Sequence, residues 1–503
     1  MRTIPTTMAT QHPDNATAPY WSKDGNPFIG THLEITDCMA SFSDMDIPEY
    51  MWDWEGKHAD AAVIDKLFTK YYDYFSKLGL GKDIFLTFRL PNIWEEKGYS
   101  LLQAMSVILS SEDFARDLGF ANRPLFEVIL PMTERADQLM HMHTLFQKLA
   151  EFKSNEFTPS QPKNTDYLEV IPLVESVESQ RGVRKLLDEY VKLHQRHFGR
   201  KPTYIRPFFA RSDPALVSGL LSTVLANKLA LSEAYTFSSD TGIPVFPIAG
   251  VGSLPFRGGL TPDTAVNYAS SNPGIRTVSI QSAFRFDYPL AKVKAALRQL
   301  DSQLPKNKPR IYSDKVSAVL TGISEQAAQY YQQHLTGLVP DMQTIFAAVP
   351  RRRERRQHIG LLAYGRSMGK QQLPRAITFT AGFYSIGVPP EFIGLGKTLL
   401  GLSQHKLDVL QKEHSAFSTD LEQAGRFLNR DNLDVLAKRN SAWKAIKEDI
   451  AATETLLGVR FQPRTNDERA HKNLTSNVLL LKNNHQALSQ LIAETAVLRK
   501  SLG

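Results

Sequence analysis

The sequence predicts an α/β fold, a (β/α)8 barrel of the TIM type that carries a large additional, mainly helical C-terminal portion. Short apolar, β-branched segments recur at spacings of roughly 30 to 45 residues and alternate with helical patterns, as in repeated βα units. From about Asp301 onward the strand pattern fades and helical spacing takes over. A doubly wound open sheet is the alternative, less favoured because no glycine-rich turn follows the first predicted strand.

The predicted strands end on charged or amide residues, at the edge where a barrel of this type carries its catalytic groups. Seven segments fit this description: THLEITD near Glu34, IFLTFRLPN ending by Arg89, LFEVILPMTE ending at Glu134, YLEVIPLVES ending by Glu175, TYIRPFFARSD ending at Asp213, PVFPIAGVGS before Arg257, and RTVSIQSAFRF with Gln281 and Arg285. AITFTAGFY, from Ala376, is the candidate for the eighth. We therefore expect the main barrel portion, with an N-terminal catalytic loop, in residues 1–300. Residues 301–503 are expected to be mainly helical, with a remaining barrel segment near 375–400.

The segments between the strands carry apolar stripes at helical spacing. In ADQLMHMHTLFQKLAEF, the side chains of Leu139, Met142, Phe146 and Leu149 fall on one face of a helix. Crossovers of this length join parallel strands. The barrel prediction follows from this alternation.

Composition places the chain among globular proteins. Its 503 residues are 42% hydrophobic and 22% charged, which is enough to bury a large core. No apolar run of about 18 residues occurs and the N-terminus lacks the pattern of a secretory signal, so we expect a cytoplasmic protein without membrane association. Cys38 is the single cysteine, which excludes an intramolecular disulfide, and any metal site must use oxygen or imidazole ligands.

The net charge of +7 suits an anionic partner without identifying it. The sharpest basic cluster is RRRERR, residues 351–356, which is typical of a solvated face or an interaction patch rather than of nucleic-acid binding. No aromatic-rich RNA or DNA motif accompanies it. We therefore expect no nucleic-acid partner.

Two carboxylates stand at the ends of successive predicted strands. Glu175 ends EVIPLVES and Asp213 ends FFARSD. Two hard oxygen donors on one rim are what Mg²⁺ or Mn²⁺ requires while it keeps several waters. Either carboxylate alone is as readily a salt-bridge partner for a helix, and it is their matching positions that favour a metal site.

The predicted rim also contains arginines. Planar guanidinium forks recognise carboxylate and phosphate groups in a bidentate manner. In RGG, Gly258 and Gly259 allow the backbone to approach a ligand closely. The candidate arginines are Arg89, Arg211, Arg257, Arg285, Arg366 and Arg375.

The motifs TQHPDN, EVILPMTE, EVIPLVES, ARSDPAL, PFRGGLTP and LPRAITFTAGFYSIGVPPEFIGLG together resemble the archaeal-type phosphoenolpyruvate carboxylases. The resemblance runs almost from end to end. It implies condensation of phosphoenolpyruvate with bicarbonate to oxaloacetate and phosphate, through carboxyphosphate and a metal-bound enolate. It also implies Mg²⁺ or Mn²⁺ as cofactor and a homotetrameric assembly.

The same resemblance assigns roles to individual residues. A histidine before proline is by itself more often a turn residue, but the family motif implies that His12 is the catalytic base. Arg257 corresponds to the catalytic arginine of the RGG motif, and Glu175 and Asp213 to the metal ligands. The implied substrate-binding residues are Gly258, Gly259, Gln281, Arg285, Arg366 and Arg375.

Three departures separate this chain from the longer bacterial and plant enzymes of similar function. IAGVGSLP lacks the His-Gly-Arg element that precedes their RGG arginine, and Leu216 stands where they have a lysine. We expect Arg89 and Arg211 to replace these groups as substrate-binding residues. The C-terminal signature of the long enzymes is also missing, since the chain ends in LRKSLG.

Two other functions are compatible with parts of the pattern. Another metal-dependent barrel enzyme that acts on phosphoenolpyruvate or pyruvate would use the same residue types. An RNA- or DNA-binding protein would use the segment around Arg351, and its binding would depend steeply on salt.

Overall fold

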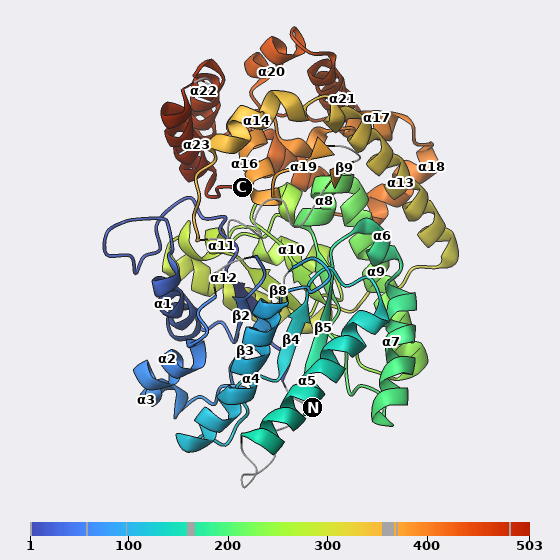
Figure 1. Ribbon diagram of the computed structural model, residues 1–503. Helices are drawn as coiled ribbons and strands as arrows, with labels where there is room; N and C mark the ends of the chain where they lie inside the picture. The colour runs from blue at the N-terminus through green and yellow to red at the C-terminus, as the bar shows by residue number, and fades with distance from the viewer. Residues whose placement is uncertain are drawn as a thin grey trace.

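The computed structural model describes residues 3–56, 59–96, 98–157, 166–354, 367–368, 371–481 and 484–503. Within them, eight parallel strands form a closed barrel in chain order, in the lower half of Figure 1. β8 closes the barrel by pairing in parallel with β1, where Ala9 lies opposite Ile280. The predicted barrel is therefore confirmed. The strands are β1 (Thr7–Thr10), β2 (Glu49–Asp53), β3 (Phe85–Arg89), β4 (Glu127–Leu130), β5 (Glu169–Val174), β6 (Phe208–Ala210), β7 (Ile248–Gly250) and β8 (Thr277–Ile280).

Helices connect the strands and surround the barrel (Figure 1). They are α1 (Glu34–Met39), α2 (Val63–Lys70), α3 (Tyr72–Phe75), α4 (Tyr99–Asp117), α5 (Ala136–Glu156), α6 (Val177–Arg181), α7 (Val183–Phe198), α8 (Ser212–Ser218), α9 (Leu220–Thr241), α10 (Ala265–Ser271), α11 (Ser282–Phe286) and α12 (Leu290–Gln303). Short helical turns accompany them: η1 (Thr31–Leu33), η2 (Ala40–Asp44), η3 (Pro255–Arg257) and η4 (Leu304–Lys306).

The C-terminal portion is mainly helical, as predicted. Its elements are α13 (Asp314–Thr336), α14 (Val339–Ala348), α16 (Ala376–Ser385), η5 (Pro390–Phe392), α17 (Leu395–Leu400), α18 (Gln404–Glu413), α19 (Phe417–Gly425), α20 (Arg430–Ala437), α21 (Ser441–Leu457), α22 (Asn466–Leu480) and α23 (His485–Arg499). β9 (Ser367–Met368) and β10 (Gln371–Gln372) form a small antiparallel pair.

Two predicted strands are wrong. AITFTAGFY forms helix α16, although its aromatic and β-branched residues favour a strand. Phe379 and Phe383, four residues apart, place their ring centroids 4.7 Å from each other, and both rings pack against Phe346 of α14. This packing overrides the local preference, so the barrel has no segment near 375–400.

THLEITD forms η1 and the start of α1 instead of a strand. Ile35 and Met39 lie one helical turn apart and are both buried. The strands that the prediction missed are β1 and β2, whose residues are all buried and show no alternation of apolar and polar side chains. A short, fully buried strand leaves little periodic pattern in a sequence.

The barrel interior holds an apolar layer and, below it, a charged layer. The apolar layer consists of Met8, Met51, Ile129, Ile171, Leu173, Phe208, Ala210 and Ile248. At the amino ends of the strands, Arg206 donates to Glu49 at 3.0 and 2.8 Å and also to Glu127. All three side chains are buried. Burial alone would lower the pKa of Arg206, but Glu127 and Glu49 outweigh it and raise the pKa above its ordinary value.

We expect Arg206→Ala to lower the free energy of unfolding by about 3–5 kcal/mol, because it leaves two buried carboxylates without their counter-charge. Urea unfolding followed by circular dichroism measures the change. Arg196→Ala, on the exposed face of α7, is the matched control and should change stability by less than about 0.5 kcal/mol. A loss below about 1 kcal/mol for Arg206→Ala would contradict a structural role for this charged layer.

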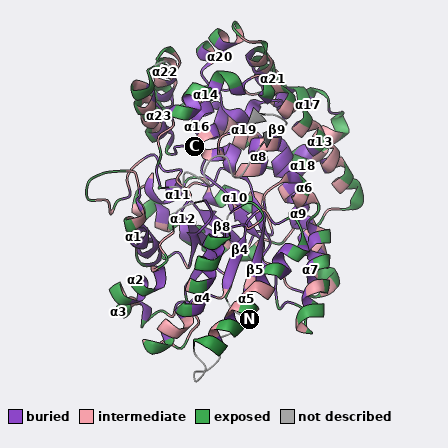
Figure 2. Cartoon of the chain, in the orientation of Figure 1, coloured by how far each residue is buried: buried purple, intermediate pink, exposed green. Residues whose placement is uncertain are grey.

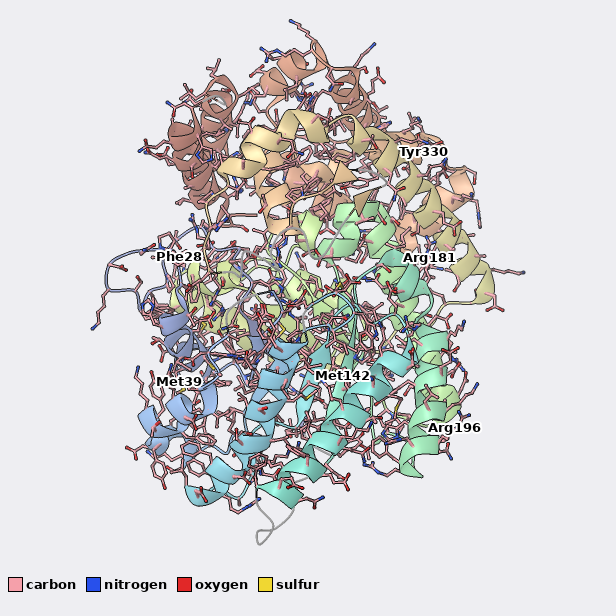
Figure 3. The ribbon with its side chains drawn as sticks, in the orientation of Figure 1. Phe28, Met39, Met142, Arg181, Arg196 and Tyr330 are labelled. Atoms are coloured by element: carbon pink, nitrogen blue, oxygen red, sulfur yellow. The ribbon has the colours of Figure 1, made fainter. Side chains whose placement is uncertain are left out.

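The helical portion packs over the edge where the barrel strands end (Figures 1 and 2). One apolar cluster joins Leu216 of α8, Leu220 of α9 and Phe256 of η3 to helices α13–α23. Arg181, at the end of α6, donates to Ser324 of α13 at 2.9 Å, and its side chain can be followed in Figure 3. Because α8 and α9 take part in both halves, the division at residue 300 stays a prediction. None of the helices in the described ranges is apolar over the length that a membrane crossing needs.

Candidate active site

The carboxyl ends of the strands bring the predicted polar residues to one rim. This rim lies beneath the helical portion, so the residues on it are half-buried or buried. Each position follows directly from where its strand ends. The rim residues are His12 after β1, Arg89 at the end of β3, Glu175 after β5, Asp213 after β6, Arg257 after β7 and Gln281 after β8.

Arg257 is the centre of a buried cluster. Its Nη2 donates to Gln281 Oε1 at 2.6 Å, its Nη1 to Asp14 Oδ2 at 3.2 Å, and its Nε to Ser212 Oγ at 3.1 Å. Burial lowers the pKa of Arg257, and Asp14 and Asp213 oppose this shift. The side chain is only 1% exposed, so its fork is held in one orientation.

Glycines make room for this arginine. A Cβ added to Gly252 would lie 2.8 Å from the Arg257 guanidinium carbon, a contact that side chains essentially never make. Gly258 has φ of +123° and Gly259 has φ of +73°, which other residues adopt only with strain. The backbone turn that positions Arg257 therefore requires the RGG sequence. Gly252 was not among the predicted site residues.

Asp14 is a second residue that the sequence prediction missed. It is fully buried, and its Oδ1 accepts from the main-chain N–H of Ala283 at 2.8 Å. Burial raises its pKa, and Arg257 opposes this shift. The feature of the sequence that could have identified Asp14 as a site residue is its position in TQHPDN, two residues after His12. Asp14 thus ties the loop after β1 to the loops after β7 and β8.

The C-terminal residues enter the same cluster. The main-chain oxygen of Gly503 accepts from Arg257 Nη1, and the Leu502 N–H donates to the main-chain oxygen of Asp14 at 2.6 Å. Ser501, Leu502 and Gly503 are all buried. LRKSLG therefore reaches the rim although it lacks the signature of the long enzymes.

His12 is oriented by its own strand. Its Nδ1 lies 2.9 Å from Thr10 Oγ1, and its main-chain oxygen accepts from the Ser282 N–H at 3.4 Å. The ring is half-buried at the rim. The contact with Thr10 orients the ring, as a role in proton transfer requires.

Glu175 and Asp213 follow the neighbouring, paired strands β5 and β6. Glu175 Oε2 accepts from the Met132 N–H at 2.7 Å, and Met132 adopts a left-handed conformation with φ of +48°. No group of three or more His, Cys, Asp or Glu side chains suited to a metal occurs in the described ranges. Mg²⁺ needs only one or two carboxylates when waters and a phosphorylated substrate complete its shell, so two half-buried carboxylates fit such an ion.

Arg89 is held by carboxylates that the prediction missed. Its Nε and Nη2 bond Asp53 at 2.9 and 2.7 Å, and its Nη1 lies 2.7 Å from Glu55 Oε2. Burial alone would lower its pKa, but Asp53, Glu55 and Glu175 raise it well above the ordinary value. Arg89 therefore links the end of β2 to the neighbourhood of Glu175.

Arg285 is buried in an ion-pair cluster with Asp37. It donates to Asp37 Oδ1, to Ser41 Oγ at 2.8 Å and to the main-chain oxygen of Thr10 at 2.8 Å. Arg353 bonds the other Asp37 oxygen. Burial would raise the pKa of Asp37, but Arg285 and Arg353 outweigh it and lower the pKa to about 2. The structure thus places the Arg285 guanidinium beside Asp37.

Two arginines of the basic cluster are not on a solvated face, although Arg351 is exposed. Arg352 donates to the main-chain oxygen of Asn15 at 3.0 Å, and Arg352 and Arg353 are both buried. The expectation was wrong for these two residues because they pack against the N-terminal segment and Asp37. Arg355 and Arg356 lie outside the described residues.

Two of the remaining predicted arginines, Arg211 and Arg375, lie within the described ranges. The side chain of Arg211 lines a cavity beside β6 and β7. Arg375 is half-buried at the start of α16, where its main-chain oxygen accepts from the Phe379 N–H at 2.9 Å. Arg366 lies outside the described residues.

Comparisons with known proteins identify the family of this chain. Residues 4–503 match the family model described as phosphoenolpyruvate carboxylase. The chain is 48% identical to the phosphoenolpyruvate carboxylase of Leuconostoc mesenteroides over 100% of its own length and 99% of that protein. It is 45% identical to that of Oenococcus oeni, again over 100% and 99%. The phosphoenolpyruvate carboxylase of the archaeon Metallosphaera sedula is 37% identical over 100% of both chains. The chain therefore belongs to the archaeal-type phosphoenolpyruvate carboxylases, a family of carbon–carbon lyases.

Proposed function

We propose that this chain condenses phosphoenolpyruvate with bicarbonate at the rim formed by His12, Glu175, Asp213 and Arg257, with release of oxaloacetate and phosphate. The observation that carries the proposal is the buried Arg257 cluster, which joins the loops after β1, β6, β7 and β8 at one point. The full-length family match supports it.

The first step requires a phosphoryl group to move from an enol oxygen to bicarbonate. A bicarbonate oxygen forms the new bond to phosphorus, the bond from phosphorus to the enol oxygen breaks, and carboxyphosphate and the enolate of pyruvate result. Arg257 lies at the turn that also presents the Gly258 and Gly259 backbone, so its charge stabilises the migrating group. Gln281 and Asp14 keep its fork in place.

The second step requires a base and the exclusion of water. His12 takes the proton of carboxyphosphate, which breaks into phosphate and CO₂, and the enolate carbon attacks the CO₂ to form oxaloacetate. Water at this stage would protonate the enolate to pyruvate. The burial of Asp14, Arg257 and Gln281 beneath the helical portion favours such exclusion.

Glu175 and Asp213 are the residues that would hold Mg²⁺ or Mn²⁺. When bound, such an ion supplies positive charge that stabilises developing negative charge on oxygen. Glu175 is oriented for this role by its hydrogen bond from Met132. Arg89 acts on Glu175 electrostatically and, with Asp53 and Glu55, supports this side of the rim.

We also propose that the working protein is a homotetramer, as the resemblance to the family implies. Light scattering coupled to size-exclusion chromatography measures the mass directly. A mass of four chains of 56.5 kDa each would support the proposal, and a monomeric mass would contradict it.

The decisive assay couples oxaloacetate to malate dehydrogenase and follows NADH oxidation. Purified protein with Mg²⁺ or Mn²⁺, phosphoenolpyruvate and bicarbonate should form oxaloacetate without biotin or nucleotide. Omission of bicarbonate should abolish phosphate release as well, whereas a mutase, an aldolase or a lyase of another family would not require bicarbonate. Absence of oxaloacetate under these conditions would contradict the proposed function.

We expect Glu175→Gln and Asp213→Asn each to raise the metal concentration that supports half-maximal activity by at least about tenfold, because each removes an anionic ligand from a site with few. Activity is titrated against Mg²⁺ and Mn²⁺, and circular dichroism checks the fold. Glu134→Gln, at the turn after β4 where Glu134 is exposed, is a matched control that should leave the titration unchanged. An unchanged metal dependence in either site variant would remove that residue from the ligand set.

A further inference from the structure

A second cavity lies outside the barrel, beside the rim but separate from the Arg257 cluster. Its volume is about 350 Å³. It is bounded by the outer face of β6 and β7, by Gly258 and Gly259 of the RGG turn, by α9 and α10, and by the segment from His414 to Gln423. Phe209 and Ala249 line the cavity and belong to the hydrophobic core that packs between the strands and the surrounding helices. Phe208 and Ile248, their chain neighbours, point into the barrel instead.

Charged side chains line this cavity although they are largely buried. Arg211 is 8% exposed, and its Nε has no hydrogen-bond partner within the described ranges. Lys228, also 8% exposed, donates to the main-chain oxygen of Ser271 at 3.0 Å. Asp420 faces these two cations, and the buried His414 places Nε2 3.9 Å from Asp420 Oδ2.

The cavity lining carries two cationic side chains, Arg211 and Lys228, and one carboxylate, Asp420, to balance them. Burial, together with the neighbouring Arg211, lowers the pKa of Lys228 to about 8. Burial also raises the pKa of Asp420 to about 6, against the influence of Arg211 and Lys228. A buried cation is costly unless a counter-charge compensates it. An anion in the cavity would supply that charge.

We propose that this cavity binds a small oxyanion, a carboxylate or phosphate group held between Arg211 and Lys228. The guanidinium fork of Arg211 suits bidentate contact with either group, and Lys228 adds a second charge. The volume is that of a site for a small molecule. Asn227 and Thr264 also line the cavity, where Asn227 Nδ2 donates to Gln180 Oε1 at 2.7 Å and Thr264 Oγ1 donates to the main-chain oxygen of Gly259 at 2.6 Å.

The cavity has a short path to the rim. Arg211 is followed by Ser212, whose Oγ accepts from Arg257 Nε at 3.1 Å, and by Asp213. A Cβ added to Gly258 would lie 3.4 Å from Arg211 Cγ, so the Arg211 stem packs against the RGG turn. Occupancy of the cavity should therefore change the KM for phosphoenolpyruvate. This consequence rests on the proposed function, whereas the binding of the oxyanion to the cavity does not.

Calorimetric titration with sulfate tests the site on the full chain without turnover. Sulfate bound at the catalytic rim should be unchanged in Lys228→Gln, because Lys228 lies outside that rim. The component in the cavity should weaken at least about tenfold in this variant, which keeps an N–H donor but loses the charge. Lys185→Gln, the same charge change on the exposed face of α7, should match the wild type. Equal sulfate binding by the wild type and Lys228→Gln would overturn the proposal.

Arg211→Gln gives an independent test should Lys228→Gln fail to fold, and it too should lose the cavity component. Displacement of sulfate by inorganic phosphate or by succinate then distinguishes the two sources of the oxyanion, and displacement by neither contradicts the assignment. A crystal of the wild type soaked in selenate should show an anomalous peak between Arg211 and Lys228. A crystal with selenate only at the catalytic rim would likewise overturn it.

Discussion

His12→Asn should lower oxaloacetate formation by roughly 10² to 10⁴, the loss typical of removing a positioned acid or base, while phosphate release continues. The residues proposed to bind phosphoenolpyruvate and the metal remain in this variant. Carboxyphosphate should therefore still form, and the enolate should end as pyruvate because carboxylation is not completed. Phosphate, pyruvate and oxaloacetate are measured in parallel, with bicarbonate present and absent.

The control for this variant is His405→Asn, which makes the same change on an exposed position of α18 and should leave all three products unchanged. Oxaloacetate at the wild-type rate in His12→Asn would return His12 to the role of a hydrogen-bonded turn residue. A parallel loss of phosphate would place His12 in the first step instead.

Arg257→Ala should impair the first step, so phosphate and oxaloacetate should fall together, by about 10² to 10³ in kcat. The reason is the loss of the charge that stabilises the migrating phosphoryl group. The same change leaves Asp14 buried without its partner, and the variant should also unfold at lower urea concentration. Both products and the urea midpoint are measured.

Arg257→Lys separates the two effects. Lysine keeps a charge beside Asp14, but it cannot contact Ser212, Asp14 and Gln281 at once as the fork does. We expect the stability of Arg257→Lys to be near that of the wild type. The rates at which it forms phosphate and oxaloacetate should nevertheless be low, within about tenfold of the rates of Arg257→Ala. Phosphate release that survives in either variant while oxaloacetate is lost would contradict a role of Arg257 in phosphoryl transfer.

Much of the rim could be predicted because its residues follow strands with strong patterns. The ends of β3, β5, β6, β7 and β8 carry Arg89, Glu175, Asp213, Arg257 and Gln281, and the structure places each of them at the carboxyl edge. Parallel strands in a barrel must end on one side, so a local pattern is enough to gather such residues. The barrel itself was predictable for the same reason.

The partners of these residues were not predictable. Asp37 is 248 positions from Arg285 and 316 from Arg353, and Gly503 is 246 from Arg257. No local pattern links residues at such separations. Whether an arginine faces a substrate or a buried carboxylate is decided by which loops the fold brings together.

The sequence by itself therefore determined the alternation of strands and helices, the edge on which the polar residues gather, and the family. Only the tertiary structure decided that AITFTAGFY is helical, because the packing of Phe379 and Phe383 against Phe346 outweighs strand propensity. It also decided that Arg211 lines a cavity outside the barrel while Arg257 is enclosed at the rim. Burial and ion pairing depend on contacts between residues far apart in the chain, and these contacts exist only once the chain has folded.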